Sequence, residues 1–263
     1  MKVYWVVFSN TIQRALIYRS RIFTYAFINV FTPILMMVIW TKHYQSGGVV
    51  GNYTYSELLS YYVAVTLIGL VTSRVNANVT EDIRDGELSN YVIKPFNYFG
   101  FRFFWEVAWH VVKFAVFAVP LLAIIYLGGF RVEFTSEPTL LLIAVFAFLL
   151  SYVLSFTLSM LIGSLAFLIT ETTGITNLYD VLIELFTGKL FPLAFFPILI
   201  QQILTVTPFK YLIAFPAEAL LGQHDINGLM AGIGMQLLWI LAVFTLYHLN
   251  WKRGIRKFSA VGL

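Results

Sequence analysis

One uninterrupted apolar stretch, TLLLIAVFAFLLSYVLSFTLSMLIGSLAFLI at residues 139–169, contains no charged side chain. A helix needs about 20 mostly apolar residues to cross the hydrocarbon core of a bilayer, so this stretch spans it with tilt or overhang. The rest of the chain has a similar character, since 59% of its 263 residues are hydrophobic and 11% are charged. A soluble domain carries about 25% charged residues. The composition therefore predicts an all-α integral membrane protein.

Outward from this stretch, the other apolar runs complete a set of six transmembrane helices in a single domain of residues 1–263. Residues 1–21 alternate apolar and basic side chains, which favours a helix lying in the membrane interface, with an irregular lead-in to the first span as the alternative. Prolines interrupt the run at residues 188–222, so one continuous helix is not expected there. The predicted spans are 22–41, 57–78, 107–127, 139–169, 171–190 and 226–250.

The distribution of lysine and arginine predicts the orientation of these spans. With the N-terminus inside, thirteen of the 17 basic residues fall on the inner side and four on the outer side. The bias predicts a multi-pass protein of the cytoplasmic (inner) membrane with both termini in the cytoplasm. It also places the polar loop of residues 79–105 in the cytoplasm.

The residues that carry most enzymatic chemistry are absent or scattered in this sequence. There is no cysteine, which excludes disulfides and thiolate metal sites, and the four histidines lack metal-ligand spacing. The only Gly-Lys pair, Gly188-Lys189, lacks the other residues of a phosphate-binding loop. No serine lies in a nucleophile-elbow sequence. We therefore predict no catalytic centre, no metal and no cofactor in this chain, and no nucleic-acid partner.

The longest polar interval, EDIRDGELSNYVIKPFNYF at residues 81–99, separates the second and third predicted spans. Gly86 permits a tight turn, and we expect Glu87 to begin a short polar helix that Pro95 ends. This helix would offer a soluble partner both charge signs and two apolar anchors, Leu88 and Tyr91. A solvated connector without a partner is the alternative. The residues assigned to partner contact are Glu81, Asp82, Arg84, Asp85, Gly86, Glu87, Leu88, Tyr91, Lys94 and Pro95.

Small residues recur every four positions along the fourth predicted span. Such a ladder lets another helix approach closely, either within this chain or at a dimer seam. On the third span, three polar residues at helical spacing predict a local ion pair, with a functional role as the alternative. The ladder consists of Ser151, Ser155, Ser159 and Gly163, and the polar residues are Glu106, His110 and Lys113.

The fifth predicted span carries Asn177, Asp180 and Glu184 on one face. A charge at the bilayer centre costs about 2.5–3.5 kcal/mol, so the two acids must face protein, a partner or water. They line a transport path or an interface, or else they lie near cytoplasmic water or pair with a basic residue. Both interpretations stay open at this point.

Two stretches resemble those of type-2 ABC export permeases. IRDGELSNYVIKPFNYF, at residues 83–99, is similar to the charged signature after the second span of that family. LFTGKLFPLAFFPILIQQILTVTPFKYLIAFPAEALLG, at residues 185–222, resembles its proline-rich segment before the last span. The resemblance covers nearly the whole chain and includes the span count.

This resemblance implies the membrane half of an ATP-driven exporter that works with two cytoplasmic ABC ATPase subunits, which bind ATP and Mg²⁺. Residues 79–105 would then hold a cytoplasmic coupling helix, residues 1–21 an interfacial helix, and residues 191–222 a re-entrant outer segment. The chain would pair with a second permease half, a copy or a paralogue, and export an amphipathic or hydrophobic substrate across the lipid bilayer. A self-contained membrane protein, such as a lipid-modifying enzyme or a channel, is the alternative.

Overall fold

The computed structural model describes residues 2–17, 34–47, 53–169 and 171–258, and these residues are organised as helices. Residues 34–45 are helical, and three short 3₁₀ turns lie at Leu165–Phe167, Leu193–Phe195 and Lys210–Leu212. The other helices are α1 (Lys2–Ile17), α3 (Tyr55–Val71), α4 (Asn76–Arg84), α5 (Ser89–Val92), α6 (Tyr98–Leu127), α7 (Pro138–Ser164), α8 (Thr173–Phe186), α9 (Ile198–Val206), α10 (Ala214–Leu220) and α11 (Ile226–Lys257).

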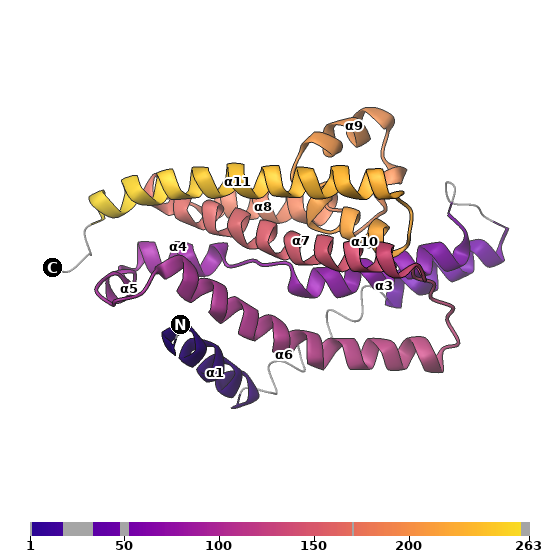
Figure 1. The fold of residues 1–263 in the computed structure, drawn as a ribbon, viewed down its shortest axis with the longest axis horizontal. Coiled ribbons are helices and arrows are strands. Elements are labelled where there is room, and N and C mark those ends of the chain that lie inside the picture. The colour runs from indigo at the N-terminus through magenta and orange to yellow at the C-terminus, as the bar shows by residue number, and fades with distance from the viewer. Residues whose placement is uncertain (1, 18–33, 48–52, 170, 259–263) are drawn as a thin grey trace.

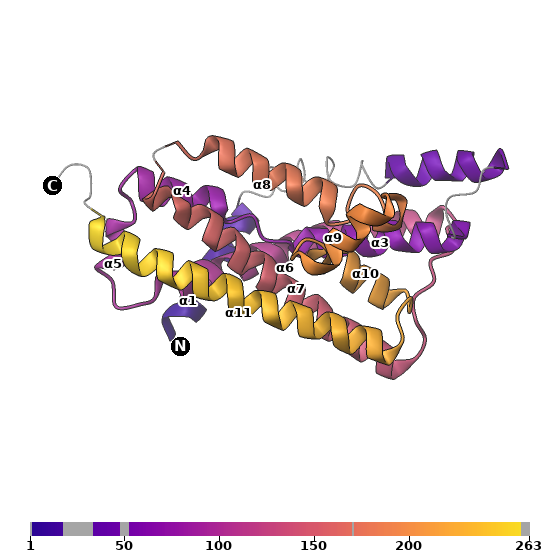
Figure 2. The same ribbon diagram turned by 90° about the horizontal axis from the view of Figure 1, so that it is seen from above.

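The long helices α6, α7 and α11 run along the molecule, with α3 and α4 following one another beside them (Figure 1). Helices α7 and α11 lie side by side, and α1 packs against α6. Both views place α4, α5 and the end of α11 at one end of the bundle, while α10 and the start of α3 lie toward the other (Figure 2). Segments that are distant in sequence therefore meet at the end that carries α4 and α5.

Four segments of the described residues are long and apolar enough to cross a membrane: Tyr55–Arg84, Tyr98–Leu127, Pro138–Phe167 and Ile226–Lys257. Only about a third or less of the most apolar part of α6, α7 and α11 is buried inside the chain. Large apolar side chains such as Leu142 and Leu241 point outward, with 74% and 70% of their surface exposed. Helices whose backbone groups are paired internally and whose apolar side chains face outward are suited to lipid. The chain is a multi-pass membrane protein.

Two of the six predicted spans are not among these four segments. Residues 22–33 of the predicted first span, 22–41, lie outside the described residues. The predicted fifth span, 171–190, contains α8, whose 14 residues extend about 21 Å, less than the hydrocarbon core of about 30 Å. Helix α8 ends because Gly188 adopts φ 82°, a left-handed conformation that glycine accepts readily, and Pro192 follows.

The predicted boundaries of three further spans shift in the structure. The predicted second span, 57–78, is interrupted at residues 72–75, between the end of α3 and the start of α4. Helix α6 begins at Tyr98, so residues 98–105, predicted as loop, form its first turns. Arg102 does not interrupt this start, because an acidic partner compensates its charge. Helix α11 extends to Lys257, seven residues beyond the predicted end at 250, and the Asp225 side chain caps its start by accepting a hydrogen bond from the Gly228 N–H at 2.9 Å.

The segment at residues 191–222 is divided into short helices, as its prolines predict. It contains α9 and α10 together with two of the 3₁₀ turns. Helix α10 packs into the main core against α3 and α7, where Phe215 is buried against Gly232 of α11. Helix α9 instead leaves large apolar side chains exposed, among them Ile198 at 69% and Leu199 at 66%.

Candidate functional site

Helix α4, the turn that follows it and α5 form a corner at one end of the bundle, which we call the α4–α5 corner (residues 76–97) (Figure 1). The chain turns at Gly86, where φ is 76°. The Leu88 N–H donates to the Asp82 carbonyl at 2.7 Å, and the Ser89 hydroxyl donates to the Gly86 carbonyl at 2.7 Å. The tight turn predicted at Gly86 is confirmed. The short helix begins at Ser89 rather than Glu87 and ends three residues before Pro95.

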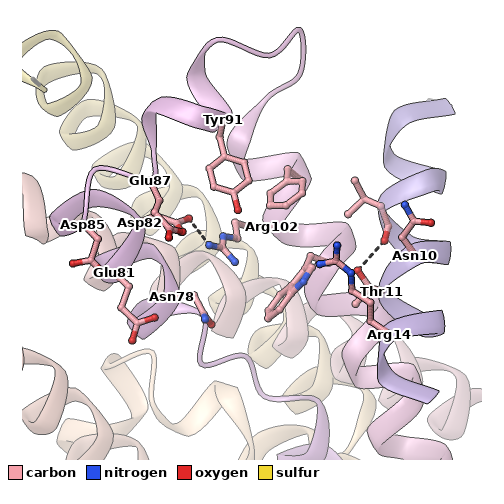
Figure 3. Close-up of a pocket in the computed structure, with 13 residues that line it drawn as sticks. Asn10, Thr11, Arg14, Asn78, Glu81, Asp82, Asp85, Glu87, Tyr91 and Arg102 are labelled. Atoms are coloured by element: carbon pink, nitrogen blue, oxygen red, sulfur yellow. Dashed lines mark hydrogen bonds and ion pairs between the residues drawn. The ribbon is translucent and has the colours of Figure 1, made fainter. Parts of the chain in front are cut away.

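A buried polar cluster joins this corner to α6. The Arg102 guanidinium donates to the Asp82 carboxylate (Figure 3). The Tyr98 hydroxyl donates to the same carboxylate, and Arg102 Nε donates to the Tyr98 hydroxyl at 3.0 Å. Only 6% of the Asp82 side chain and 7% of the Arg102 side chain are exposed. Asp82, predicted to contact a partner, therefore points inward and ties α4 to the start of α6.

The two predicted apolar anchors belong to the packing of the corner. Leu88 is fully buried in a cluster with Val79 and Phe156, so the prediction that it offers a surface to a partner is wrong. Tyr91 is half-buried, with its ring centroid 4.9 Å from that of Phe101. Burial is the main cause that raises the pKa of the Tyr91 hydroxyl above its ordinary value. Both side chains hold the corner in shape.

Other side chains of the corner are presented to the outside. Val92 and Ile93 expose 50% and 81% of their surface, and they directly follow Tyr91 in the sequence. Arg84 lies 3.9 Å from Glu171, so its side chain already forms a long ion pair within the chain. Gly86 is half-buried in the turn, and the remaining predicted contact residues are exposed, namely Glu81, Asp85, Glu87, Lys94 and Pro95.

A polar cavity of about 400 Å³ lies between the corner, α1 and α6 (Figure 3). Acidic side chains from α4 and the turn form one wall, and Arg14 of α1 lies on the other. Helix α1 packs on α6, and α4 is bonded to α6, so the cavity lies between the predicted interfacial helix (1–21) and the predicted cytoplasmic loop (79–105). It is lined by Val7, Asn10, Thr11, Arg14, Asn78, Glu81, Asp82, Asp85, Glu87, Tyr91, Phe101, Arg102 and Trp105.

The small-residue ladder of α7 packs within this chain, against the break between α3 and α4 (residues 72–75) and the first turns of α4. The Ser155 hydroxyl accepts from the Ser73 N–H at 3.1 Å, and the Ser159 hydroxyl accepts from the Asn76 N–H at 2.8 Å. A side chain at Gly163 would collide with Val79 and with the Asn76 carbonyl. Ser151 instead donates to Phe148 of its own helix. The ladder supplies hydrogen bonds to a helix start that has no cap of its own.

The acidic face of α8 pairs with basic residues. Glu184 lies 3.0 Å from Arg74 of the α3–α4 break and 2.8 Å from Lys189, and Asp180 lies 3.9 Å from Arg74. All four side chains are about one third to one half exposed, and Asn177 is exposed on the same helix. The interpretation that these acids pair with a basic residue is confirmed. The four paired side chains nevertheless remain partly exposed.

The family model for ABC-2 family transporter proteins matches residues 27–262. The chain belongs to this family. The resemblance drawn from residues 83–99 and 185–222 is thereby confirmed, and the match identifies the chain as a membrane component of the ABC transporter class. No curated protein gave a match.

In this ABC-2 permease, sequence reasoning missed two features of the site. One is the pairing of Asp82 with Arg102. The only signal for this pair in the sequence is that opposite charges lie near the two ends of the polar stretch that begins at residue 81. The other is the exposed pair Val92 and Ile93, which the apolar triplet at residues 91–93 indicates only by its composition.

Proposed function

We propose that this ABC-2 permease is the transport subunit of an ATP-driven exporter and that its α4–α5 corner receives the force of a cytoplasmic ABC ATPase. The observation that carries the proposal is the division of the corner into two parts. Its inner side chains, Asp82 and Leu88, bind it to the bundle, while its outer side chains include exposed carboxylates and the exposed Ile93. An exposed apolar side chain on a rigid, charged projection suits a protein partner.

The connections of the corner explain how a push on it would reach the membrane helices. Asp82 joins α4 to α6 through Arg102, and Asn76 joins α4 to α7 through Ser159. A partner that holds the corner in two positions, with different affinity, would therefore shift α6 and α7 between two arrangements. ATP and Mg²⁺ belong to the ATPase, of which we propose two copies per transporter, and this chain supplies motion without chemistry of its own.

The charged face of α8 supports the proposal of a second permease half. Charges that face lipid near the bilayer centre cost about 2.5–3.5 kcal/mol each, so exposed Asp180 and Glu184 favour a location beside water or protein. We place this face, with Asn177, toward a copy of this chain or a paralogue, along the path of an amphipathic or hydrophobic substrate. We place the corner and both termini in the cytoplasm and residues 191–222 as a re-entrant segment on the outer side, from the distribution of basic residues and the family resemblance.

The test combines Glu87→Lys with Ile93→Ser in the permease expressed with its ATPase. Both side chains are exposed, so we expect normal insertion and an unchanged melting temperature, with loss of the ATPase stimulation that the permease confers. Glu133→Lys makes the same charge change in the loop at the opposite end of α6 and serves as the control. A second double variant, Arg84→Glu with Glu87→Lys, reverses two charges of the corner, and we expect it to insert normally and to lose the ATPase stimulation as well.

If the corner variant stimulates the ATPase as strongly as the Glu133→Lys control does, the α4–α5 corner does not couple the ATPase to the permease. Uphill transport by the purified permease without any companion subunit would exclude ATPase dependence altogether, and it would favour the self-contained membrane protein.

A further inference from the structure

The last two turns of α11 carry an exposed group of four basic side chains, which we call the α11 basic face: Lys252, Arg253, Arg256 and Lys257. At about 100° per residue, they fall within an arc of about 140° on one side of the helix. None of them forms an ion pair with an acidic side chain among the described residues. Cations in the last turn suit the negative end of the helix dipole, but Lys252 and Arg253 precede that turn. The dipole therefore does not account for the whole face.

The opposite side of this helix end is fixed to the bundle. The Trp251 ring stacks on that of Tyr98 in α6, with centroids 5.0 Å apart, and lies edge to face with Phe167 at 5.3 Å. Gly254 is buried beside Phe167, where an added Cβ atom would lie 2.3 Å from the ring. This packing sets the rotation of the helix end, so the α11 basic face points away from the bundle.

Further along α11, the same side of the helix is apolar and exposed. Leu238, Leu246 and Leu249 fall within the arc of the basic residues, and they expose 55%, 55% and 46% of their surface. Helix α11 also lies along an edge of the bundle in both views (Figures 1 and 2). A lipid whose chains cover these leucines would hold its headgroup beside the α11 basic face.

The length of α11 places the basic face at the depth of the headgroups. Its 32 residues extend about 48 Å, whereas the hydrocarbon core is about 30 Å thick with about 5–8 Å of headgroup region on each side. The mostly apolar residues 229–249 extend about 32 Å and fill the core. Lys252 then lies about 5 Å beyond Leu249, and the long side chains of Arg256 and Lys257 can reach back from the next turn.

We propose that the α11 basic face binds the headgroup phosphates of anionic phospholipids whose chains lie along Leu238, Leu246 and Leu249. Clusters of four or more basic residues next to a membrane span attract anionic lipids. A zwitterionic headgroup carries its own cation beside the phosphate, whereas an anionic headgroup leaves the phosphate charge for the protein. An acidic surface of the ATPase would match the charge, but only a lipid also covers the leucines. The site follows from α11 and its packing alone, so it does not depend on the proposed ATPase coupling.

The test measures the lipids that full-length permease retains from nanodiscs of equal parts phosphatidylglycerol and phosphatidylcholine, by native mass spectrometry. We expect the unmodified permease to retain phosphatidylglycerol preferentially. Replacement of the four basic residues by glutamine should lower the ratio of phosphatidylglycerol to phosphatidylcholine about fivefold or more, since one basic residue near an anionic surface already has about that effect. Lys42→Gln with Arg131→Gln removes two exposed cations outside the basic face and should leave the ratio unchanged.

A second measurement uses the unmodified permease alone. A detergent wash at about 1 M NaCl should remove more phosphatidylglycerol than a wash at about 0.1 M, because salt screens exposed charges. A preference that persists in the glutamine variant, or that salt does not change, would overturn the proposal. An equal fall in the Lys42 and Arg131 control would also overturn it, because any exposed cation would then suffice. Loss of ATPase co-purification with the lipid preference intact would assign the face to the ATPase instead.

Discussion

Replacement of Arg102 by methionine tests whether the buried ion pair beneath the α4–α5 corner holds the corner to the bundle. Methionine keeps much of the side-chain length but leaves the Asp82 carboxylate buried with Tyr98 as its remaining partner. Because the paired side chains are only 6% and 7% exposed, the relevant cost is that of an uncompensated buried charge, about 3–5 kcal/mol. This cost corresponds to a decrease of roughly 100- to 4,000-fold in the folding equilibrium.

The assay is the unfolding midpoint of the permease in nanodiscs or mild detergent, compared across three variants. Arg84→Met removes the same type of side chain from a pair that is 3.9 Å long and 41% exposed on the arginine side, so a much smaller loss is expected. Asp82→Asn combined with Arg102→Met removes the orphaned charge and should recover part of the stability. Equal losses for Arg102→Met and Arg84→Met, or a double variant less stable than Arg102→Met, would refute the reasoning.

Two further predictions concern α7 and α8. Ser159→Ala leaves the Asn76 N–H without its partner and should cost about 1–3 kcal/mol, whereas Ser151→Ala, which removes a bond within α7 only, should cost less; thermal unfolding compares the two. Asp180→Asn with Glu184→Gln should slow transport in proteoliposomes without loss of folded protein, and an unchanged transport rate would exclude these acids from the path.

The membrane character and the helical class of this chain were predictable because they depend on local composition. A run such as residues 139–169 is apolar whichever way it packs, and prolines and Gly188 interrupt helices through their own backbone geometry. The family resemblance was likewise carried by local strings, at residues 83–99 and 185–222, and the family match confirms it.

The inner and outer sides of the corner were not predictable, because tertiary contacts decide them. Leu88 is an apolar residue in a polar stretch, and only its packing against Phe156, far along the chain, makes it a core residue. Asp82 is one of several acidic residues in the same polar stretch, and its burial is explained only by its ion pair with Arg102. One of the two partners of Glu184 in α8, Arg74, lies 110 residues away, a separation at which sequence spacing carries no information.

The serine ladder of α7 also constrains the order in which this protein can be completed in the membrane. The N–H groups of Ser73 and Asn76 find their partners at Ser155 and Ser159, which follow 82 and 83 residues later in the chain. At about 5–20 residues per second of synthesis, the two acceptor serines are synthesised roughly 4–16 s after the residues that carry these amides. The segment Tyr55–Arg84 therefore cannot complete these two hydrogen bonds until α7 has been synthesised, and its final docking on α7 belongs to a later stage of biogenesis.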